Sequence, residues 1–139
     1  MEYRRISLDD IEIVLGMEGV FRDDFLKKEC VTDFLKNSMN WIFVCILDNR
    51  IIGFIYGYEL NRLNRAENML YIHEVGILPD FQRKGIGTEL IERLKKECHR
   101  KNIYKMFLFT QKSNIGACKL YDKTGGKTTL DSTAVRFNI

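Results

Sequence analysis

The segment Gln82–Thr88 has residue types and spacing suited to binding a phosphate group. Its sequence, Gln-Arg-Lys-Gly-Ile-Gly-Thr, follows an apolar run typical of a strand and precedes a pattern typical of a helix. The first turn of a helix has unpaired N–H groups and the positive end of the helix dipole, so it attracts anions. Gly85 and Gly87 lack a Cβ and let the backbone approach an anion closely. Arg83 and Lys84 add positive charge at the rim.

Two other phosphate-binding patterns fit this segment less well. A Walker loop needs a lysine between its last glycine and the serine or threonine, whereas Thr88 follows Gly87 directly. A dinucleotide fingerprint needs a third glycine three positions after Gly87, and that position is Leu90. An ordinary glycine turn before a helix is the structural alternative.

A second motif strengthens the functional interpretation. It reads Asn-Ile-Gly-Ala-Cys-Lys-Leu-Tyr over residues 114–121 and continues Asp-Lys-Thr-Gly-Gly over residues 122–126. Together the two motifs resemble the GCN5-related N-acetyltransferase (GNAT) superfamily. In that family a Gln/Arg-x-x-Gly-x-Gly/Ala loop binds the coenzyme A pyrophosphate, and Asn-x-x-Ala-x-x-x-Tyr lies on a later helix. An aromatic residue is common in the family where this chain has Gly126.

The resemblance covers nearly the whole chain and implies acetyl-CoA as the cosubstrate. The strand before the loop would splay from its neighbour, so that main-chain groups of Val75, Gly76 and Ile77 could pair with the pantetheine amides. Gly76 would let this strand bend or bulge. Asn114 would help to hold the cofactor, and it is also suited to cap a helix. The pyrophosphate would bind to the loop residues Gln82, Arg83, Lys84, Gly85, Ile86, Gly87 and Thr88.

Two residues are the catalytic candidates. Tyr121 matches the family's general acid, which would protonate the departing thiolate; a core tyrosine is the structural alternative. Glu74 could take the proton of the attacking amine directly or through water, and a cross-strand ion pair is its alternative. His73 is the competing base, and strand alternation predicts that only one of these neighbours faces the site. The motif strand has no cysteine, so we expect direct attack in a ternary complex, and Cys118 is expected to serve packing.

The acceptor amine is less clearly indicated. Within the superfamily, the sequence Tyr-Ile-His-Glu-Val-Gly-Ile of residues 71–77 is similar to the aminoglycoside 3-N-acetyltransferase subfamily. That subfamily has an aspartate where this chain has Glu74, and it ends in Phe-Asp-Ile where this chain ends in Phe137-Asn138-Ile139. The resemblance suggests an aminoglycoside, and the departures leave another amine open.

Charge is divided unevenly along the chain. Residues 1–80 contain 9 Lys/Arg and 14 Asp/Glu, a balance of −5, and residues 81–139 contain 13 and 5, a balance of +8. The basic half suits an anionic cofactor, and the acidic half suits a cationic amine such as a polyamine, an aminoglycoside or a lysine-bearing protein. Two solvated faces of different charge are the alternative. From the residues and the resemblance we expect a cationic small-molecule acceptor.

Hydrophobic patterning predicts the elements that must position these residues. Their order predicts an antiparallel hairpin followed by a βαβ crossover with a parallel pair. The predicted class is therefore α+β, layered α/β/α, with a mixed, mostly antiparallel central sheet, helices on both faces, and the acyl-CoA N-acyltransferase fold that the resemblance implies. Strands are expected at residues 3–6, 41–47, 51–60, 69–78, 103–110 and 134–139, and helices from Ser7, over 21–36, over 85–99 and over 114–123.

Length and composition add further expectations. A chain of 139 residues predicts a single N-acetyltransferase domain over residues 1–139. No apolar run suits a signal peptide or a membrane span, so we expect a cytoplasmic protein with no membrane partner. The four cysteines are scattered, which predicts free thiols, and two histidines without clustered ligands predict no metal site.

The pattern leaves other classes of protein open. The basic residues lack the interleaved aromatics of a nucleic-acid-binding protein, so no nucleic-acid partner is expected, and a homodimer is compatible with the sequence. A domain that binds acetyl-CoA as a sensor or structural module, without transferring anything, is the main alternative. A binding protein for another phosphate ligand is a third hypothesis.

Overall fold

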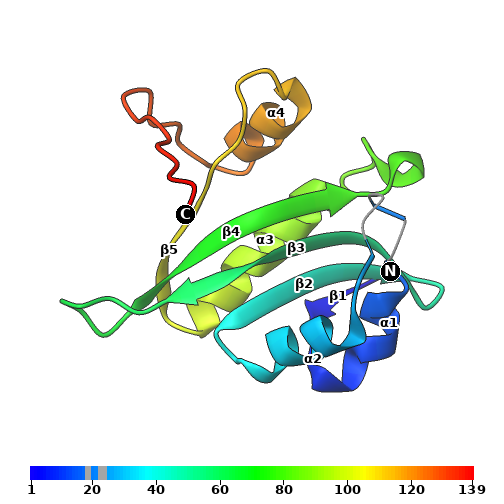
Figure 1. Ribbon diagram of the computed structural model, residues 1–139. Coiled ribbons are helices and arrows are strands. Elements are labelled where there is room, and N and C mark those ends of the chain that lie inside the picture. The colour runs from blue at the N-terminus through cyan, green and yellow to red at the C-terminus, as the bar shows by residue number, and fades with distance from the viewer. Residues whose placement is uncertain (18–19, 22–24) are drawn as a thin grey trace. The chain divides into compact units, whose positions relative to one another are not determined.

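A five-stranded sheet is the central element of the computed structural model, which describes residues 1–17, 20–21 and 25–139 (Figure 1). The strand order is β1-β2-β3-β4-β5; β4 and β5 pair parallel, and the other neighbours pair antiparallel. This confirms the prediction of a mixed, mostly antiparallel sheet. The strands are β1 (Glu2–Arg5), β2 (Asn40–Leu47), β3 (Arg50–Leu60), β4 (Asn68–Ile77) and β5 (Ile103–Leu108).

Helices cover both faces of this sheet. The 3-10 helix η1 (Leu8–Asp10), α1 (Ile11–Leu15) and α2 (Lys28–Lys36) lie over one face, and α3 (Ile86–Arg100) lies over the other (Figure 1). On the first face, Val14 and Val31 share a core cluster with Val44 and Phe54. The opposite face is packed so closely that a Cβ on Gly53 would lie 3.1 Å from the Leu90 side chain. The predicted layers are therefore present.

The chain forms two compact units, residues 1–109 and 110–139. The second contains α4 (Ile115–Lys123), which ends at Lys123 as predicted and is followed by a glycine pair. Gly125 has φ of 89°, its N–H donates to the carbonyl of Asp122 at 3.1 Å, and the N–H of Gly126 donates to the carbonyl of Tyr121 at 2.8 Å. These two bonds form a Schellman motif, which satisfies carbonyl groups at the end of the helix.

Two expected elements differ from the structure. Residues 134–139 alternate apolar and polar side chains, yet they form no strand, and Phe137 is 81% exposed. Alternation alone is insufficient, because a strand also needs a neighbour with which to pair. The helix expected over 21–36 begins only at Lys28, although residues 22–24 lie outside the described part of the chain. Phe25 and Leu26 are not helical; their apolar side chains line a cavity described below.

A β-bulge interrupts the pairing of β3 with β4. Tyr56 stands opposite Glu74 and Gly57 stands opposite Ile72, so His73 is an extra residue in β4. A Cβ on Gly57 would lie 2.0 Å from the carbonyl oxygen of Tyr71, which makes glycine necessary at this point.

The sequence suggested that β4 could bulge at Gly76, but the bulge lies at His73. At Gly76 the strand stays in register, with Phe54 opposite it. A Cβ on Gly76 would lie 2.4 Å from Cε1 of Phe54, so this glycine makes room for an aromatic ring.

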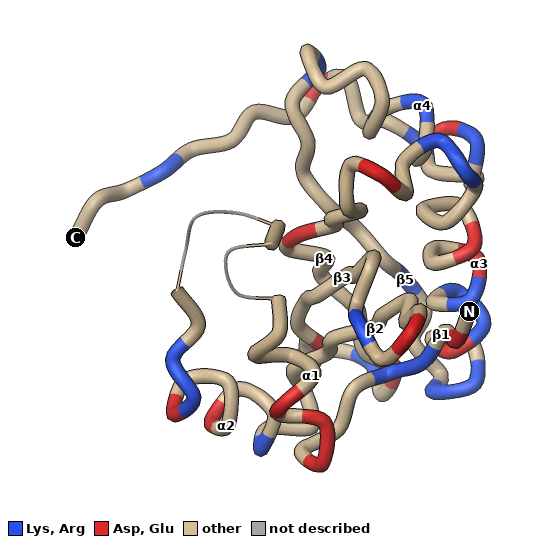
Figure 2. Tube along the Cα trace, turned by 90° about the vertical axis from the view of Figure 1, so that its right-hand side faces the viewer, with Lys and Arg blue, Asp and Glu red and all other residues tan. Residues whose placement is uncertain are grey.

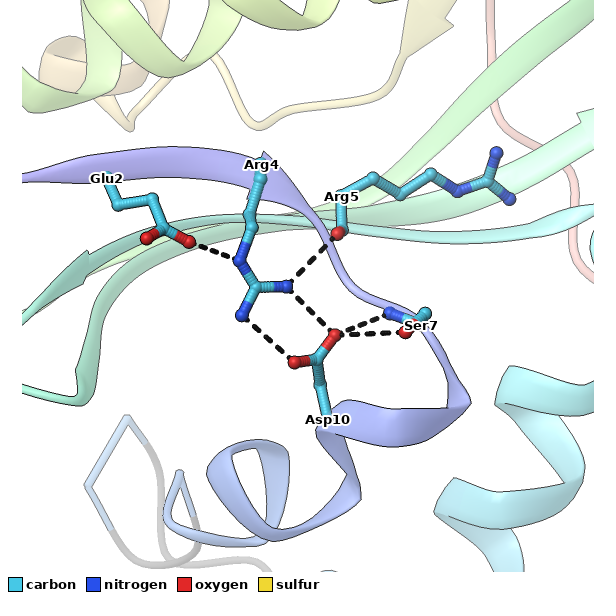
Figure 3. Close-up of polar contacts among 5 residues, drawn as sticks. All are labelled: Glu2, Arg4, Arg5, Ser7 and Asp10. Atoms are coloured by element: carbon cyan, nitrogen blue, oxygen red, sulfur yellow. Dashed lines mark hydrogen bonds and ion pairs between the residues drawn. The ribbon is translucent and has the colours of Figure 1, made fainter.

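Charged contacts fix the entry to η1 (Figure 3). The carboxylate of Asp10 accepts two hydrogen bonds from the guanidinium of Arg4, each 2.9 Å long. The same carboxylate accepts from the backbone N–H of Ser7 at 2.8 Å, which completes a capping box at the helix start that the sequence predicted at Ser7. Arg4 also pairs with Glu2. The guanidinium of Arg4 holds the pKa of Asp10 below its usual value, outweighing the opposite effect of burial.

We expect Asp10→Asn to lower the free energy of unfolding by about 1 kcal/mol at neutral pH, because it weakens these charged hydrogen bonds. Since the folded pKa of Asp10 is depressed, its stabilising effect is present above the unfolded pKa of about 3.9 and is lost as pH falls through the folded value. Urea unfolding of both proteins at several pH values measures this. Asp9→Asn is the control, and a stability difference that persists unchanged in strong acid would contradict the assignment.

Gly57→Ala should destabilise the protein by about 1–3 kcal/mol, because the new methyl group meets a backbone carbonyl that cannot move aside cheaply. Gly116→Ala is the matched control, since a Cβ there has no atom within 4 Å. Denaturant unfolding should show a large loss for the first variant and little change for the second. Equal stability of the two variants would mean that the bulge tolerates a side chain.

Candidate functional site

The carboxyl-terminal half of β4 has an edge that β5 does not cover. Parallel pairing begins at Asn68 opposite Ile103 and ends at Ile72 opposite Leu108, whereas β4 continues to Ile77. Over its last residues β4 therefore pairs with β3 on one side only. A strand edge of this kind can pair with an extended ligand through main-chain hydrogen bonds.

Val75, Gly76 and Ile77, which the sequence predicted in a strand, lie in this stretch of β4. One of the main-chain groups is already used, since the carbonyl of Ile77 accepts a hydrogen bond of 3.0 Å from Nε2 of Gln82. Gln82 thus ties the loop back to the strand. This contact gives Gln82 a positioning role in addition to the cofactor contact expected from the motif.

The loop after β4 passes through the short 3-10 helix η2 (Pro79–Phe81) and opens at the amino terminus of α3. Arg83 has φ of 59° and Gly85, the N-cap of α3, has φ of 83°, so two residues here take the left-handed conformation. A Cβ on Gly85 would meet no atom within 4 Å. The space above this glycine is open, and the first N–H groups of a fifteen-residue helix lie beside it.

The positive charge at this loop comes from exposed side chains that precede the helix. Arg83 and Lys84 are both exposed. The helix α3 itself carries both basic and acidic residues (Figure 2). Three ion pairs join them, at 2.6 Å for Arg93 with Glu89, 3.1 Å for Lys95 with Glu92, and 2.5 Å for Arg100 with Glu97.

Glu74 lies on the wall of a cavity of about 450 Å³. The cavity lies on the sheet face that carries α1 and α2, and its lining is mostly aliphatic and aromatic. The described residues that line it are Val14, Met17, Phe21, Phe25, Leu26, Lys27, Cys30, Val31, Phe34, Ile42, Phe54, Tyr56, Tyr58 and Glu74.

The bulge places His73 on the same face as Glu74. Glu74 stands opposite Tyr56 in the sheet, and the ring of His73 lies 5.2 Å from the ring of Tyr56. The hydroxyl of Tyr71 and Nδ1 of His73 are hydrogen-bonded at 3.1 Å, with a donor that depends on the histidine tautomer. Strand alternation, from which we expected only one of these neighbours to face the site, does not hold here because the extra residue changes the phase.

The motif of residues 114–121 is described within the second unit. Oδ1 of Asn114 accepts a hydrogen bond of 3.1 Å from the N–H of Ala117, so Asn114 is the N-cap of α4. Tyr121 is half-buried, and this burial raises the pKa of its phenol. The thiol of Cys118 is half-buried and donates to the carbonyl of Gln111 at 3.6 Å. A phenol with a raised pKa stays protonated at neutral pH, as a proton donor must.

Sequence reasoning missed the aromatic wall of the cavity. Phe54, Tyr56 and Tyr58 alternate along β3 and so lie on one face. Phe21 and Phe34 contact these rings from outside the sheet. The alternation of aromatic residues was a usable signal, but nothing local showed that helices would leave space above them.

Some kinds of site were not found in the described part of the chain. Its His, Cys, Asp and Glu residues form no group of three or more that could hold a metal ion. None of its helices has the length and apolar character needed to cross a membrane. All four cysteines are free thiols, with Cys45 and Cys98 buried and Cys30 exposed.

Comparison with known proteins identifies relatives of the chain. The model of the Acetyltransferase (GNAT) family matches residues 12–126. The N-alpha-acetyltransferase of Saccharolobus solfataricus is 25% identical over 131 residues, which are 89% of this chain and 78% of that protein.

Solved structures share the fold at lower identity. An aminoglycoside acetyltransferase from an uncultured soil metagenomic sample, in complex with sisomicin, has a TM-score of 0.90 at 19% identity and covers 99% of this chain and 95% of its own. AAC(6')-Iy, in complex with a bisubstrate analogue of CoA, has a TM-score of 0.80 at 17% identity. The match covers 99% of this chain and 98% of that one.

Gly85→Asn should weaken CoA binding by about tenfold or more, because it places a side chain in the open space beside the helix terminus. Asparagine tolerates a positive φ, so the melting temperature should change little. Asn102→Gly is the control, since Asn102 has φ of 60° beyond the other end of α3. Calorimetric titration with CoA checks both variants, and wild-type affinity in folded Gly85→Asn protein would remove this loop from the binding site.

Proposed function

This chain belongs to the GNAT acetyltransferase family, and on that basis we propose that it acetylates a small-molecule primary amine with Glu74 as general base and Tyr121 as general acid. The family's activity is the transfer of the acetyl group of acetyl-CoA to an amine. The observation that carries the proposal is the position of Glu74. Glu74 lines the cavity, and it belongs to the half of β4 whose edge is not covered by β5.

The cosubstrate would be held by main-chain groups of this chain. Val75, Gly76 and Ile77 offer an uncovered strand edge to its extended pantetheine arm. The N–H groups from Arg83 to Thr88 and the open space at Gly85 suit its pyrophosphate. Bound there, acetyl-CoA supplies the thioester that the amine attacks. Asn114, which caps α4, is proposed to help to hold it.

Two proton transfers accompany the exchange of bonds. A bond forms between the amine nitrogen and the acetyl carbon, and the bond between that carbon and sulfur breaks. Glu74 takes one proton from the amine, directly or through water, and Tyr121 gives one proton to the departing sulfur. His73 shares the face of Glu74 and is the competing base. The motif strand β4 contains no cysteine that could carry the acetyl group, so we propose direct attack in a ternary complex.

The aminoglycoside acetyltransferases among the structural neighbours support a small-molecule acceptor. A second candidate is the amino terminus of a polypeptide, which the relative named N-alpha-acetyltransferase favours. The test is release of free thiol from acetyl-CoA in the presence of small amines or short peptides. Release with peptides alone would reject the small-molecule proposal, and no release by a protein that binds acetyl-CoA would favour a non-catalytic sensor.

Glu74→Gln should reduce kcat/KM by about 10²–10⁴-fold while leaving CoA affinity unchanged, because the amide keeps the shape of the side chain and cannot accept the proton. His73→Gln is the comparison variant and should cost much less. Initial rates of thiol release measure both. If His73→Gln shows the larger loss, or if Glu74→Gln keeps wild-type turnover, the base is another group.

Tyr121→Phe should reduce turnover by roughly 10²-fold or more, with little change in CoA affinity or melting temperature, because only the phenolic proton donor is lost. The loss should be smaller with an acyl donor whose thiolate leaves more easily, since such a group needs less protonation. Equal losses with good and poor leaving groups would assign Tyr121 a positioning role only.

A further inference from the structure

The aromatic residues of β3 form one wall of the cavity. Phe54, Tyr56 and Tyr58 lie in sequence on the same face of the strand. Phe21 meets the ring of Phe54 edge to face, with centroids 4.8 Å apart. Phe34 meets Tyr56 and Tyr58 in the same way, at 6.0 and 5.8 Å. Five rings from three segments of the chain therefore surround one space.

Most of these rings are only partly buried in the core. Phe54 is buried, whereas Phe21, Phe34, Tyr56 and Tyr58 are only partly buried. Their remaining surface borders the cavity. Rings held by edge-to-face contacts present both edges and faces, which suit an incoming aromatic or flat apolar group.

Few of the described residues that line the cavity are charged. Of the fourteen described residues that line the cavity, only Glu74 and Lys27 are charged, and their charges are opposite. A single ammonium group can pair with Glu74, and the ring faces of Tyr56 and Tyr58 add a cation–π attraction. A second or third ammonium group would be desolvated against apolar side chains or would meet Lys27, and both cost free energy.

We propose that the acceptor is a monoamine whose primary amino group is carried on a compact aromatic or similarly apolar group. The apolar part lies against the rings of β3 and the amine points to Glu74. The cavity volume of about 450 Å³ falls within the range of roughly 300–1,000 Å³ that is usual for small-molecule sites. This inference rests on the proposed function, which it narrows from amines in general to apolar monoamines.

A panel of amines tests the inference with the wild-type protein and acetyl-CoA. Phenethylamine and tyramine represent apolar monoamines, propylamine is a small control, and spermidine and kanamycin represent polyamines. We expect kcat/KM to be about tenfold or more higher for the aromatic amines than for propylamine or for either polyamine. Higher kcat/KM for spermidine or kanamycin would overturn the inference. It would leave the proposed function intact, whereas no thiol release with any amine would reject that function itself.

Variants of α2 test whether the amine lies in this cavity. Cys30 is exposed and lines the cavity, so Cys30→Trp should fill part of it and leave the fold intact. We expect KM for phenethylamine to rise by about tenfold, with little change in CoA affinity. Asp33→Trp is the control, because Asp33 is exposed on the same helix and does not line the cavity. Equal effects of the two tryptophans would place the acceptor elsewhere.

Replacing Lys27, the one cation among the described lining residues, gives a test with the opposite sign. Lys27 is exposed, and Lys27→Glu would add a second carboxylate to the lining. We expect the ratio of kcat/KM for spermidine to kcat/KM for phenethylamine to rise several-fold. Lys28→Glu, next to it and outside the lining, is the control. An unchanged preference in the Lys27→Glu protein would contradict the charge argument.

Discussion

The unequal pairing of β4 controls the arrangement of the part of the candidate site that lies in residues 1–109. One edge of β4 pairs with β3 along its length, and the other pairs with β5 only as far as Ile72. Had β5 continued beside β4 to Ile77, the main-chain groups of that edge would be consumed within the sheet. Because the pairing stops, the strand retains hydrogen-bonding capacity just where it leads into the loop of residues 82–88 and the terminus of α3. Cosubstrate binding and catalysis can therefore share one strand.

The bulge at His73 adds a second constraint on the same strand. Without the extra residue, Glu74 and His73 would point to opposite faces, and one of them would meet the α3 side of the sheet. With it, both side chains reach the face of the cavity. The bulge requires a glycine on the partner strand β3, because a side chain at Gly57 would collide with the carbonyl of Tyr71. A glycine on β3 therefore determines where two ionisable groups of β4 lie.

Local patterns were enough to predict the parts of the site that depend on local physics. The glycines around residue 85, the apolar periodicity of α3 and the glycine stop after α4 could all be recognised in the sequence, because each reflects a backbone preference of its own residues. The bulge, the cavity and the absence of a strand at residues 134–139 depend on contacts between distant segments. Phe25 and Leu26 show the difference, since their apolar character suggested a helix face and the structure uses them as cavity lining.

The net charge of the first 80 residues does not by itself describe the proposed acceptor site. Its excess of acidic residues suggested a cationic substrate, yet several of these carboxylates have structural partners. Asp10 binds Arg4 and caps η1. Glu59 accepts hydrogen bonds from Nε1 of Trp41 at 3.0 Å and from Nδ2 of Asn68 at 2.6 Å. Of the described acidic residues, Glu74 alone lines the cavity. Under the proposal, the described part of this wall would select the acceptor by shape and apolar contact, with Glu74 to orient the amine.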